Sequence, residues 1–224
     1  MENMHRATTG PWIIGSLIAI LVTAFGFLPL PTEARIEPSE SMALHAAPWA
    51  VPIDKNLNLH QMSPLLYRSA LPRQSDLALL QSLDIRTVVS FIRKNDAQWA
   101  DLSTMTLVSL PVHADRIDDT DVITALRALH VAQSRGPVLM HCKHGRNRTG
   151  LMAAMYRIVL QGWNKEAALM EMQQGGFGDP QHMQQATRYV TRVNVAQLQQ
   201  AYARGDCSTR RVSTCRLRAW WAAW

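Results

Sequence analysis

The stretch VLMHCKHGRNRTGLMAAMYRIVL, residues 138–160, decides the fold of this chain. Its first four residues, Val138 to His141, are an apolar run of the length of a buried strand, and the breaker Arg135-Gly136-Pro137 precedes them. From Thr149 to Leu160 the apolar residues recur with helical periodicity and cover nearly all of one side. The stretch therefore predicts a buried strand, a short polar loop and a buried helix in direct succession.

The polar loop carries the candidate nucleophile, Cys142, which directly follows the strand. Successive backbone N–H groups and the start of the helix converge there, and they favour an anion. The same field lowers the pKa of a thiol and makes it nucleophilic near neutral pH. Arg148 is placed to grip two phosphoryl oxygens, Gly145 gives the loop its backbone freedom, and the Thr149 hydroxyl can donate to the thiolate. The loop is therefore expected to bind a phosphate and attack it.

The rest of the loop is expected to bind phosphate and to be held in shape by its neighbour His141. The expected phosphate-binding residues are Lys143, His144, Gly145, Arg146, Asn147 and Arg148. His141 is expected to orient the loop by hydrogen bonding rather than to act as a base. The positive rim attracts any phosphorylated surface, and it also suits phosphoinositides or inositol phosphates. The histidines show no metal-ligand spacing, so no metal and no cofactor are expected.

Strands and helices are expected to alternate along the remainder of the chain. Short β-rich runs predict strands at 65–68, 87–92 and 107–112. Pro111 indicates that the last of them lies at an edge of the sheet or ends there. Helices are predicted at 77–83, 121–134 and 165–173, followed by a glycine-rich turn and a further helix. This alternation predicts an α/β fold with a central, mostly parallel sheet flanked by helices.

Composition excludes several classes of protein. The chain has 224 residues, of which 47% are hydrophobic and 18% charged, which suits one globular domain with a leader or tail. Disordered chains, collagen and small disulfide scaffolds have other compositions. The net charge of +6 allows an anionic partner, but the body of the chain has no nucleic-acid-binding motif, so nucleic acid is not an expected partner.

The N-terminus carries an apolar segment from Trp12 to Leu28, and a small-x-small site follows at Thr32-Glu33-Ala34. Residues 1–34 are therefore expected to be a signal peptide or an N-terminal membrane anchor. Both place the rest of the chain in the periplasm, soluble after cleavage or anchored in the inner membrane. A linker is expected at 35–55, the domain at 56–203, and a basic, Trp-ended extension at 204–224.

Two features of this extension bear on its environment. Cys207 and Cys215 are expected to form a disulfide in an oxidising compartment, while Cys142 stays free. Two interpretations of the terminal tryptophans and arginines remain open. These residues either lie on an anionic membrane face or pack against the domain itself.

Several motifs together resemble the cysteine-dependent protein tyrosine phosphatase superfamily, in its dual-specificity branch. They are HCKHGRNRTG (141–150), LYRSALP (66–72), SLPVHADRIDD (109–119) and GGFGD (175–179). Over roughly residues 50–218 the chain is most similar to the periplasmic tyrosine phosphatases of Gram-negative bacteria. The resemblance implies hydrolysis of phosphotyrosine, and also of phosphoserine or phosphothreonine, in secreted or membrane-exposed proteins. It further implies a regulatory link to a membrane diguanylate cyclase and to biofilm formation.

The general acid has three candidates, Asp115, Asp118 and Asp119. Helix N-capping explains Asp118 and Asp119, which immediately precede Thr120. The resemblance implies Asp115 as the acid and base. Arg68 is a candidate second contact with substrate, but a structural role beneath the site is favoured.

Two other functions stay open at this point. One is a phosphoinositide or inositol phosphate phosphatase, which the positive rim supports. The other is an inactive phosphate-binding module, which is disfavoured because nucleophile, arginine, threonine and acid candidates are all present.

Overall fold

The computed structural model describes residues 48–210 and 212–217 of the chain, and these form an α/β fold around one six-stranded sheet. The strand order is β1-β2-β3-β6-β4-β5. The strands are β1 (Val51–Asp54), β2 (Leu59–Ser63), β3 (Leu66–Ser69), β4 (Thr87–Ser90), β5 (Thr106–Ser109) and β6 (Val138–His141). The sheet is mixed, because β1, β2 and β3 pair antiparallel while β3, β6, β4 and β5 pair parallel. The expected parallel arrangement thus holds for four strands only.

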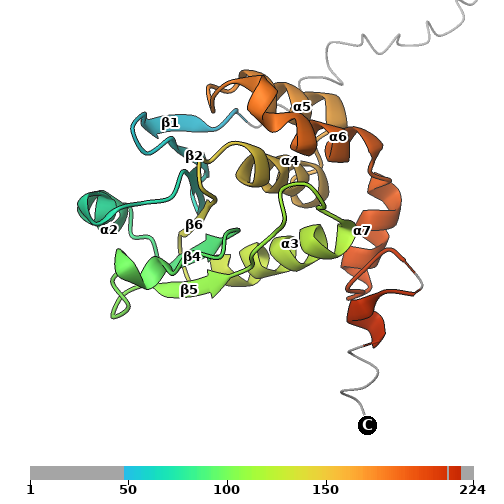
Figure 1. Cartoon of the computed structure of the whole chain (residues 1–224), viewed down its shortest axis with the longest axis horizontal. Coiled ribbons are helices and arrows are strands. Elements are labelled where there is room, and N and C mark those ends of the chain that lie inside the picture. The colour runs from blue at the N-terminus through green and yellow to red at the C-terminus, as the bar shows by residue number, and fades with distance from the viewer. Residues whose placement is uncertain (1–47, 211, 218–224) are drawn as a thin grey trace, which may run out of the picture.

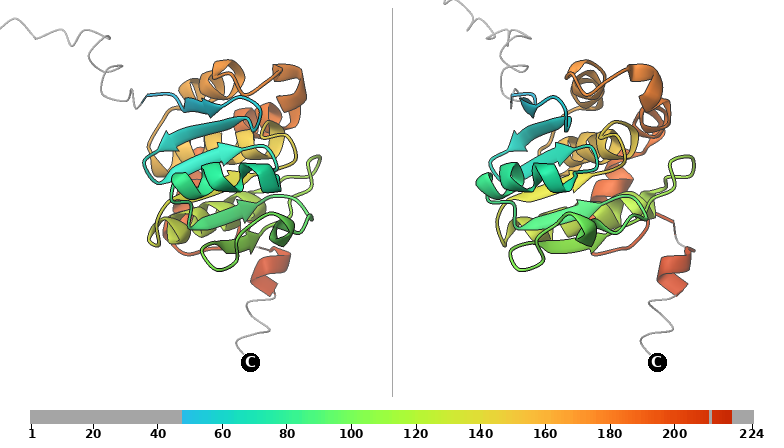
Figure 2. Two further views of the ribbon diagram at one scale, coloured as in Figure 1. Left: turned by 90° about the vertical axis from the view of Figure 1, so that its left-hand side faces the viewer. Right: turned by 60° about the vertical axis from the view of Figure 1, so that its left-hand side comes forward.

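Helices cover both faces of the sheet. Figures 1 and 2 show α2 on one face and the layer from α3 to α7 on the other. The helices are α2 (Leu77–Ser82), α3 (Asp119–Gln133), α4 (Asn147–Leu160), α5 (Lys165–Gln174), α6 (Gln184–Arg192) and α7 (Val195–Ala203). Three short 3-10 helices, η1 (Gln74–Asp76), η2 (Asp96–Gln98) and η3 (Pro180–Met183), complete the order.

The central strand β6 and the helix α4 form the buried axis of the domain. Every residue of β6 is buried, because β3 and β4 flank it and helices cover both faces. Successive side chains point to opposite faces, so Met140 packs in the core beneath α3 and α4 while Leu139 packs in the core beneath α2. The chain leaves β6 at His141 and enters α4 at Asn147. The predicted strand–loop–helix succession is therefore present, and it positions the Cys142 loop at the carboxyl end of the parallel strands.

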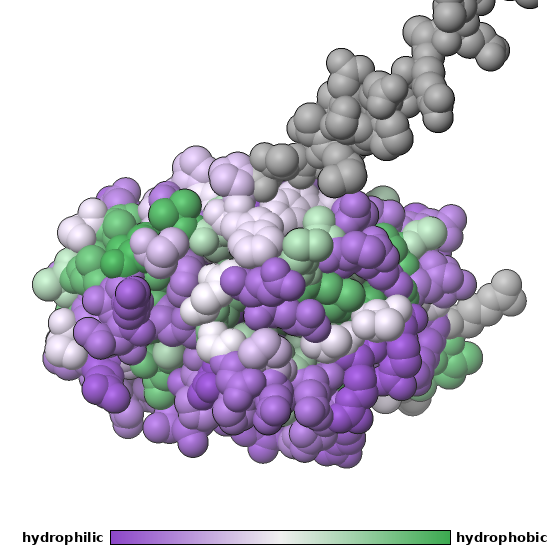
Figure 3. All heavy atoms as spheres, turned by 90° about the horizontal axis from the view of Figure 1, so that it is seen from above, coloured by the Kyte–Doolittle hydropathy of each residue, from purple (hydrophilic) through white to green (hydrophobic). Residues whose placement is uncertain are grey.

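The N-terminal hairpin of β1 and β2 was not predicted from the sequence. β1 lies within 35–55, the range expected to be a linker, and it forms the upper edge of the sheet. Val51 and Ile53 are exposed on it, and the face seen from above shows hydrophobic areas among hydrophilic ones (Figure 3). β5 occupies the other edge, in agreement with the expectation from Pro111.

Two expectations fall outside the described residues. They are the leader at 1–34 and the tryptophan-rich end of the extension. Within residues 48–210 and 212–217, none of the helices has the length and apolar character needed to cross a bilayer.

Candidate active site

The backbone of the Cys142 loop is held from outside by three hydrogen bonds to consecutive carbonyl groups. Leu71 N–H donates to Lys143 O at 3.4 Å, Asn58 Nδ2 to His144 O at 3.1 Å, and an Arg68 NH2 group to Gly145 O at 2.7 Å. In a trans peptide the carbonyl and the following N–H point in opposite directions. The N–H groups of residues 144–146 therefore face the interior of the loop, where they form a cradle for an anion.

Gly145 is required at its position in this loop. Its φ of +70° lies in the left-handed region, and a Cβ there would approach Ser69 and Ala70 backbone atoms to 2.8 Å. Only glycine satisfies both conditions without displacing the end of β3.

Cys142 is buried and lines a cavity of 290 Å³, together with Ala114, His144, Arg146, Asn147, Arg148 and His182. Burial alone would raise the pKa of the thiol. The Thr149 hydroxyl, the Thr149 and His144 N–H groups and the Arg148 guanidinium outweigh burial and hold the pKa below its ordinary value. The Thr149 hydroxyl is itself buried and has no regular hydrogen-bond partner among the described residues, so it is free to donate to a thiolate.

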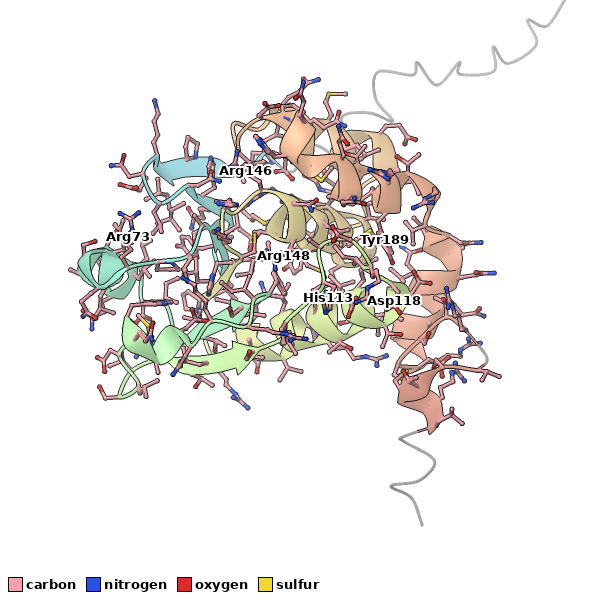
Figure 4. The ribbon with its side chains drawn as sticks, in the orientation of Figure 1. Arg73, His113, Asp118, Arg146, Arg148 and Tyr189 are labelled. Atoms are coloured by element: carbon pink, nitrogen blue, oxygen red, sulfur yellow. A yellow bond between two sulfur atoms is a disulfide. The ribbon has the colours of Figure 1, made fainter. Side chains whose placement is uncertain are left out.

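Arg148 extends from the first turn of α4 and is anchored by backbone carbonyl groups in the segments that follow β4 and β5. Its NH1 group donates to Phe91 O at 3.3 Å and to Val112 O at 3.4 Å. The guanidinium lines both the Cys142 cavity and an adjoining cavity of 300 Å³ that includes His113 (Figure 4). A planar guanidinium held at this point offers two donors to a tetrahedral anion above the thiolate.

The three acid candidates differ clearly in their surroundings. Asp118 caps α3 by accepting from the Thr120 and Asp121 N–H groups, at 2.8 and 3.1 Å. Asp119 accepts hydrogen bonds from the Tyr189 and Thr209 hydroxyls. Both carboxylates therefore have structural partners.

Asp115 is exposed and has no hydrogen-bond partner within the described part of the chain. It follows Ala114, which lines the cavity that holds Cys142. Of the three candidates, its carboxyl group is the one left available to exchange a proton with a ligand in that cavity.

Beneath the loop lies a buried acid that the sequence did not reveal. Asp96 in η2 lies 3.2 Å from Nε2 of the fully buried His141, at an angle outside regular hydrogen-bond geometry, and accepts a hydrogen bond from Trp99 Nε1 at 3.0 Å. Burial alone would raise the pKa of Asp96, but His141 and Trp99 hold it below its ordinary value. His141 was expected to orient the loop by hydrogen bonding, but neither ring nitrogen forms a regular hydrogen bond among the described residues, and its contact is with Asp96 from the segment after β4.

Arg68 lies beneath the site, where a structural role was favoured. It is buried, and besides Gly145 O it contacts the Phe177 ring, with its guanidinium carbon 3.5 Å from the ring centroid. Burial lowers the pKa of Arg68 to about 10, so it stays charged at neutral pH. The His60 ring packs against the Phe177 ring as well, at 4.7 Å between centroids. Phe177 in this way anchors the glycine-rich turn 175–179 beside the loop.

Asn58 is a further site residue that the sequence did not identify. Besides its bond to His144 O, its Nδ2 donates to Phe177 O at 3.0 Å, so one amide joins the loop to the glycine-rich turn. Its φ of +53° is tolerated by asparagine better than by most residues. The signal in the sequence that could have identified Asn58 is its position at the end of the Lys55–Asn58 turn.

The remaining loop side chains are distributed around the cavity. Lys143 and His144 are exposed, and Arg146 contacts His182 at 3.1 Å. Asn147 directs its side-chain oxygen to the Ala186 N–H at 3.0 Å, so its side chain ties α4 to α6 and is occupied there. Within the described residues, no cluster of His, Cys, Asp or Glu has the composition of a metal site.

The two C-terminal cysteines are joined. Cys207 and Cys215 form the expected disulfide, and Cys142 is the free cysteine of the described residues. The Thr209 contact with Asp119 fastens this part of the extension to the start of α3.

The Thr149 hydroxyl gives a prediction for the acidity of Cys142. In Thr149→Val the thiol loses a donor to its anion, so its pKa is expected to rise. The pH dependence of Cys142 alkylation by iodoacetamide measures this shift, with the midpoint moving to higher pH. Thr87→Val, which removes another buried and unpartnered hydroxyl at the far end of the sheet, is the matched control. Equal midpoints in the two variants would contradict the assignment.

Comparisons with known proteins agree with this geometry. Residues 55–208 match the model of the tyrosine phosphatase family. The dual specificity protein phosphatase TpbA of Pseudomonas aeruginosa strain UCBPP-PA14 is 50% identical over 219 residues, which cover 98% of this chain and 97% of the relative. A crystal structure of a P. aeruginosa TpbA variant in complex with phosphotyrosine is 55% identical, with a TM-score of 0.68, and covers 69% of this chain and 96% of that one. The inositol diphosphatase DSP3 of Arabidopsis thaliana is 26% identical over 125 residues, or 52% of this chain and 61% of the relative.

Proposed function

The chain belongs to the tyrosine phosphatase family and is a protein-tyrosine phosphatase; from this premise we propose that it is an exported dual-specificity enzyme that works through a phosphocysteine on Cys142. The single observation that carries the mechanism is the buried Cys142 thiol, with its lowered pKa, in a cavity that it shares with Arg148. A thiolate beneath inward-facing N–H groups attacks a bound phosphoryl group directly.

In the first step the Cys142 thiolate attacks phosphorus in line with the phenolic oxygen. The S–P bond forms as the P–O bond breaks, and Asp115 gives its proton to the departing oxygen. Arg148 and the loop N–H groups bind the equatorial oxygens, whose charge they stabilise throughout.

In the second step a water molecule attacks the phosphocysteine. Asp115, now ionised, accepts the proton of this water, and the S–P bond breaks to release phosphate and the Cys142 thiolate. The Thr149 hydroxyl donates to the departing sulfur, which lowers the pKa of the leaving thiol and helps it to leave.

The reaction is tested by steady-state turnover of peptides by the full chain. We expect a phosphotyrosine peptide to be hydrolysed, and a phosphoserine or phosphothreonine peptide of the same sequence to be hydrolysed more slowly. Absence of turnover of the phosphotyrosine peptide would contradict the proposal.

A second candidate is an inositol phosphate phosphatase. The rim cations Lys143 and Arg146 support it, because a polyphosphate needs several positive partners. The similarity to an inositol diphosphatase adds to this support. Turnover of an inositol polyphosphate, with no turnover of either phosphopeptide, would favour this candidate.

Export to the periplasm is also part of the proposal. The apolar segment at 12–28 supports it, and the Cys207–Cys215 disulfide belongs in an oxidising compartment. In this location we propose that the enzyme acts on phosphorylated membrane signalling proteins, such as the periplasmic part of a diguanylate cyclase that controls biofilm formation. The leader itself provides membrane association if it is retained.

The thiol content of the protein tests the export proposal. The full chain, purified without reductant, is expected to show one reactive thiol after denaturation, that of Cys142. After reduction it should show three. Three thiols before reduction would show that the disulfide does not form, and export would lose one of its main supports.

A further inference from the structure

Besides the cavity that includes His113, a second cavity lies beside the catalytic one. It has a volume of 450 Å³, and its walls come from the β1–β2 turn, the segment between β3 and α2, the Cys142 loop and the glycine-rich turn. His144 and Arg146 line both cavities, so a ligand can extend from one into the other. We call this second cavity the side groove.

The side groove is strongly positive. Lys55, Arg73, Lys143 and Arg146 line it, and none of the four forms a salt bridge with an acid of the described residues. The single acid in its lining, Asp76, already accepts the Arg73 backbone N–H at 2.8 Å. Figure 4 places Arg73 beside α2 and Arg146 near the start of α4, so the two cations come from different elements. The groove therefore offers an anion more positive charge than its own acid neutralises.

Arg146 is held where the two cavities meet. Its side chain crosses the glycine-rich turn at Gly178, where a Cβ would approach Arg146 Cδ to 2.5 Å. Its guanidinium is fixed by His182 at 3.1 Å. The chain thus leaves room at Gly178 for the Arg146 side chain beside the side groove.

The lowered pKa of His144 is a second sign of the positive charge around the groove. Partial burial and the neighbouring cations Arg146, Lys143 and Arg148 lower the pKa of His144 below its ordinary value. The imidazole is therefore neutral at pH 7, and the charge of the groove comes from its lysines and arginines.

From this placement we infer that the side groove binds acidic side chains that flank the phosphorylated tyrosine of a peptide substrate. The inference rests on the proposed function, since the groove acts only on a substrate whose phosphate lies in the Cys142 cavity. Its apolar wall is made by Leu57, Ala70 and Leu71, which suits the aliphatic parts of a peptide between its carboxylates.

The distribution of the cations favours a peptide over an inositol polyphosphate. Lys55, Arg73 and Arg146 stand on three separate elements of the groove wall, and apolar side chains line the groove as well. A compact polyphosphate ring needs cations that converge on one point, whereas successive side chains of an extended peptide meet charges that are spread out.

The test compares three phosphotyrosine peptides, one with neutral flanks and two with glutamates on one side or the other, at low ionic strength. The variant Lys55→Gln/Arg73→Gln removes two groove cations that lie outside the catalytic loop. The matched control, Arg135→Gln/Arg188→Gln, removes two exposed cations that line neither the side groove nor the Cys142 cavity. p-Nitrophenyl phosphate, which is too small to reach the groove, reports the basal reaction.

We expect the wild-type enzyme and the control to prefer one glutamate-flanked peptide by about 5-fold to 10-fold in kcat/KM, through a lower KM. The preference should fall as salt is added. In the Lys55/Arg73 variant it should shrink to less than about 2-fold, while turnover of p-nitrophenyl phosphate stays unchanged.

Three results would overturn the inference. The first is turnover of all peptides by the wild type with no acidic preference. The second is an equal preference in the groove variant and the control. The third is a loss in the groove variant that is confined to hydrolysis of inositol hexakisphosphate, assayed as a further substrate of the same proteins, which would assign the groove to a polyphosphate. Failure of the wild type to hydrolyse any phosphotyrosine substrate would instead contradict the proposed function, and the inference with it.

Discussion

Replacement of Cys142 by serine is expected to reduce turnover of a phosphotyrosine peptide by at least about 10⁴-fold. A serine hydroxyl is far less acidic than a thiol, so the field that lowers the thiol pKa does not ionise it. The inward-facing N–H groups and Arg148 are untouched by the change. The variant should therefore still bind the phosphopeptide that it does not hydrolyse.

Two measurements check this prediction: steady-state kinetics of the variant and calorimetric titration with the same peptide. A midpoint of thermal unfolding near that of the wild type shows that the variant is folded. Turnover within tenfold of the wild type would show that Cys142 is not the nucleophile. Lost binding in a folded variant would show that the thiolate itself, rather than the loop, holds the phosphate.

Replacement of Asp115 by alanine is expected to reduce kcat for a phosphotyrosine peptide by about 10²-fold to 10³-fold. The phenolic oxygen of tyrosine is a poor leaving group without a proton, and Asp115 is the acid candidate without a structural partner. p-Nitrophenol leaves readily as an anion, so the rate of the first step with p-nitrophenyl phosphate should fall much less. The comparison of the two substrates measures proton donation directly.

Asp119→Asn is the matched control for this prediction. The amide can still accept from the Tyr189 hydroxyl, so the start of α3 should stay in place and activity should stay within a few-fold of the wild type. Comparable loss with Asp119→Asn and little loss with Asp115→Ala would reverse the assignment of the acid.

The sequence alone was sufficient for the strand–loop–helix unit because its signals are local. Residues 135–160 contain a breaker, an apolar run, a polar loop with one glycine and a helical pattern, and each sets the structure of its own segment. Asn164 is a similar case: it caps α5 by accepting from the Ala167 N–H at 2.7 Å, and the interaction spans three residues.

The β1–β2 hairpin could not be predicted because its stability comes from its partners. Most of β1 is exposed, so it shows no alternation of buried and exposed residues. It is held by pairing with β2 and, at Ala50, by the backbone N–H that donates to the buried Glu171 at 2.8 Å. Glu171 lies on α5, 121 residues further along the chain.

The supports of the loop were missed for the same reason. Asn58 reaches His144 across 86 residues, and Asp96 in η2 contacts His141 at the end of β6. A single asparagine or aspartate in a turn is ordinary in sequence, and only the fold brings it under the Cys142 loop. The nucleophile could therefore be predicted from its motif, but the groups that aim the backbone at the phosphate could not.

The central claim, that Cys142 is phosphorylated during the reaction, is tested most directly by trapping the intermediate. In Asp115→Ala, p-nitrophenyl phosphate should still phosphorylate Cys142, because its leaving group needs no proton, but hydrolysis of the phosphocysteine lacks its base. Rapid acid quench and peptide mass spectrometry are expected to find one phosphoryl group on the peptide that contains Cys142. Continued release of p-nitrophenol with no phosphoryl group on that peptide, or with the group on another residue, would contradict the account.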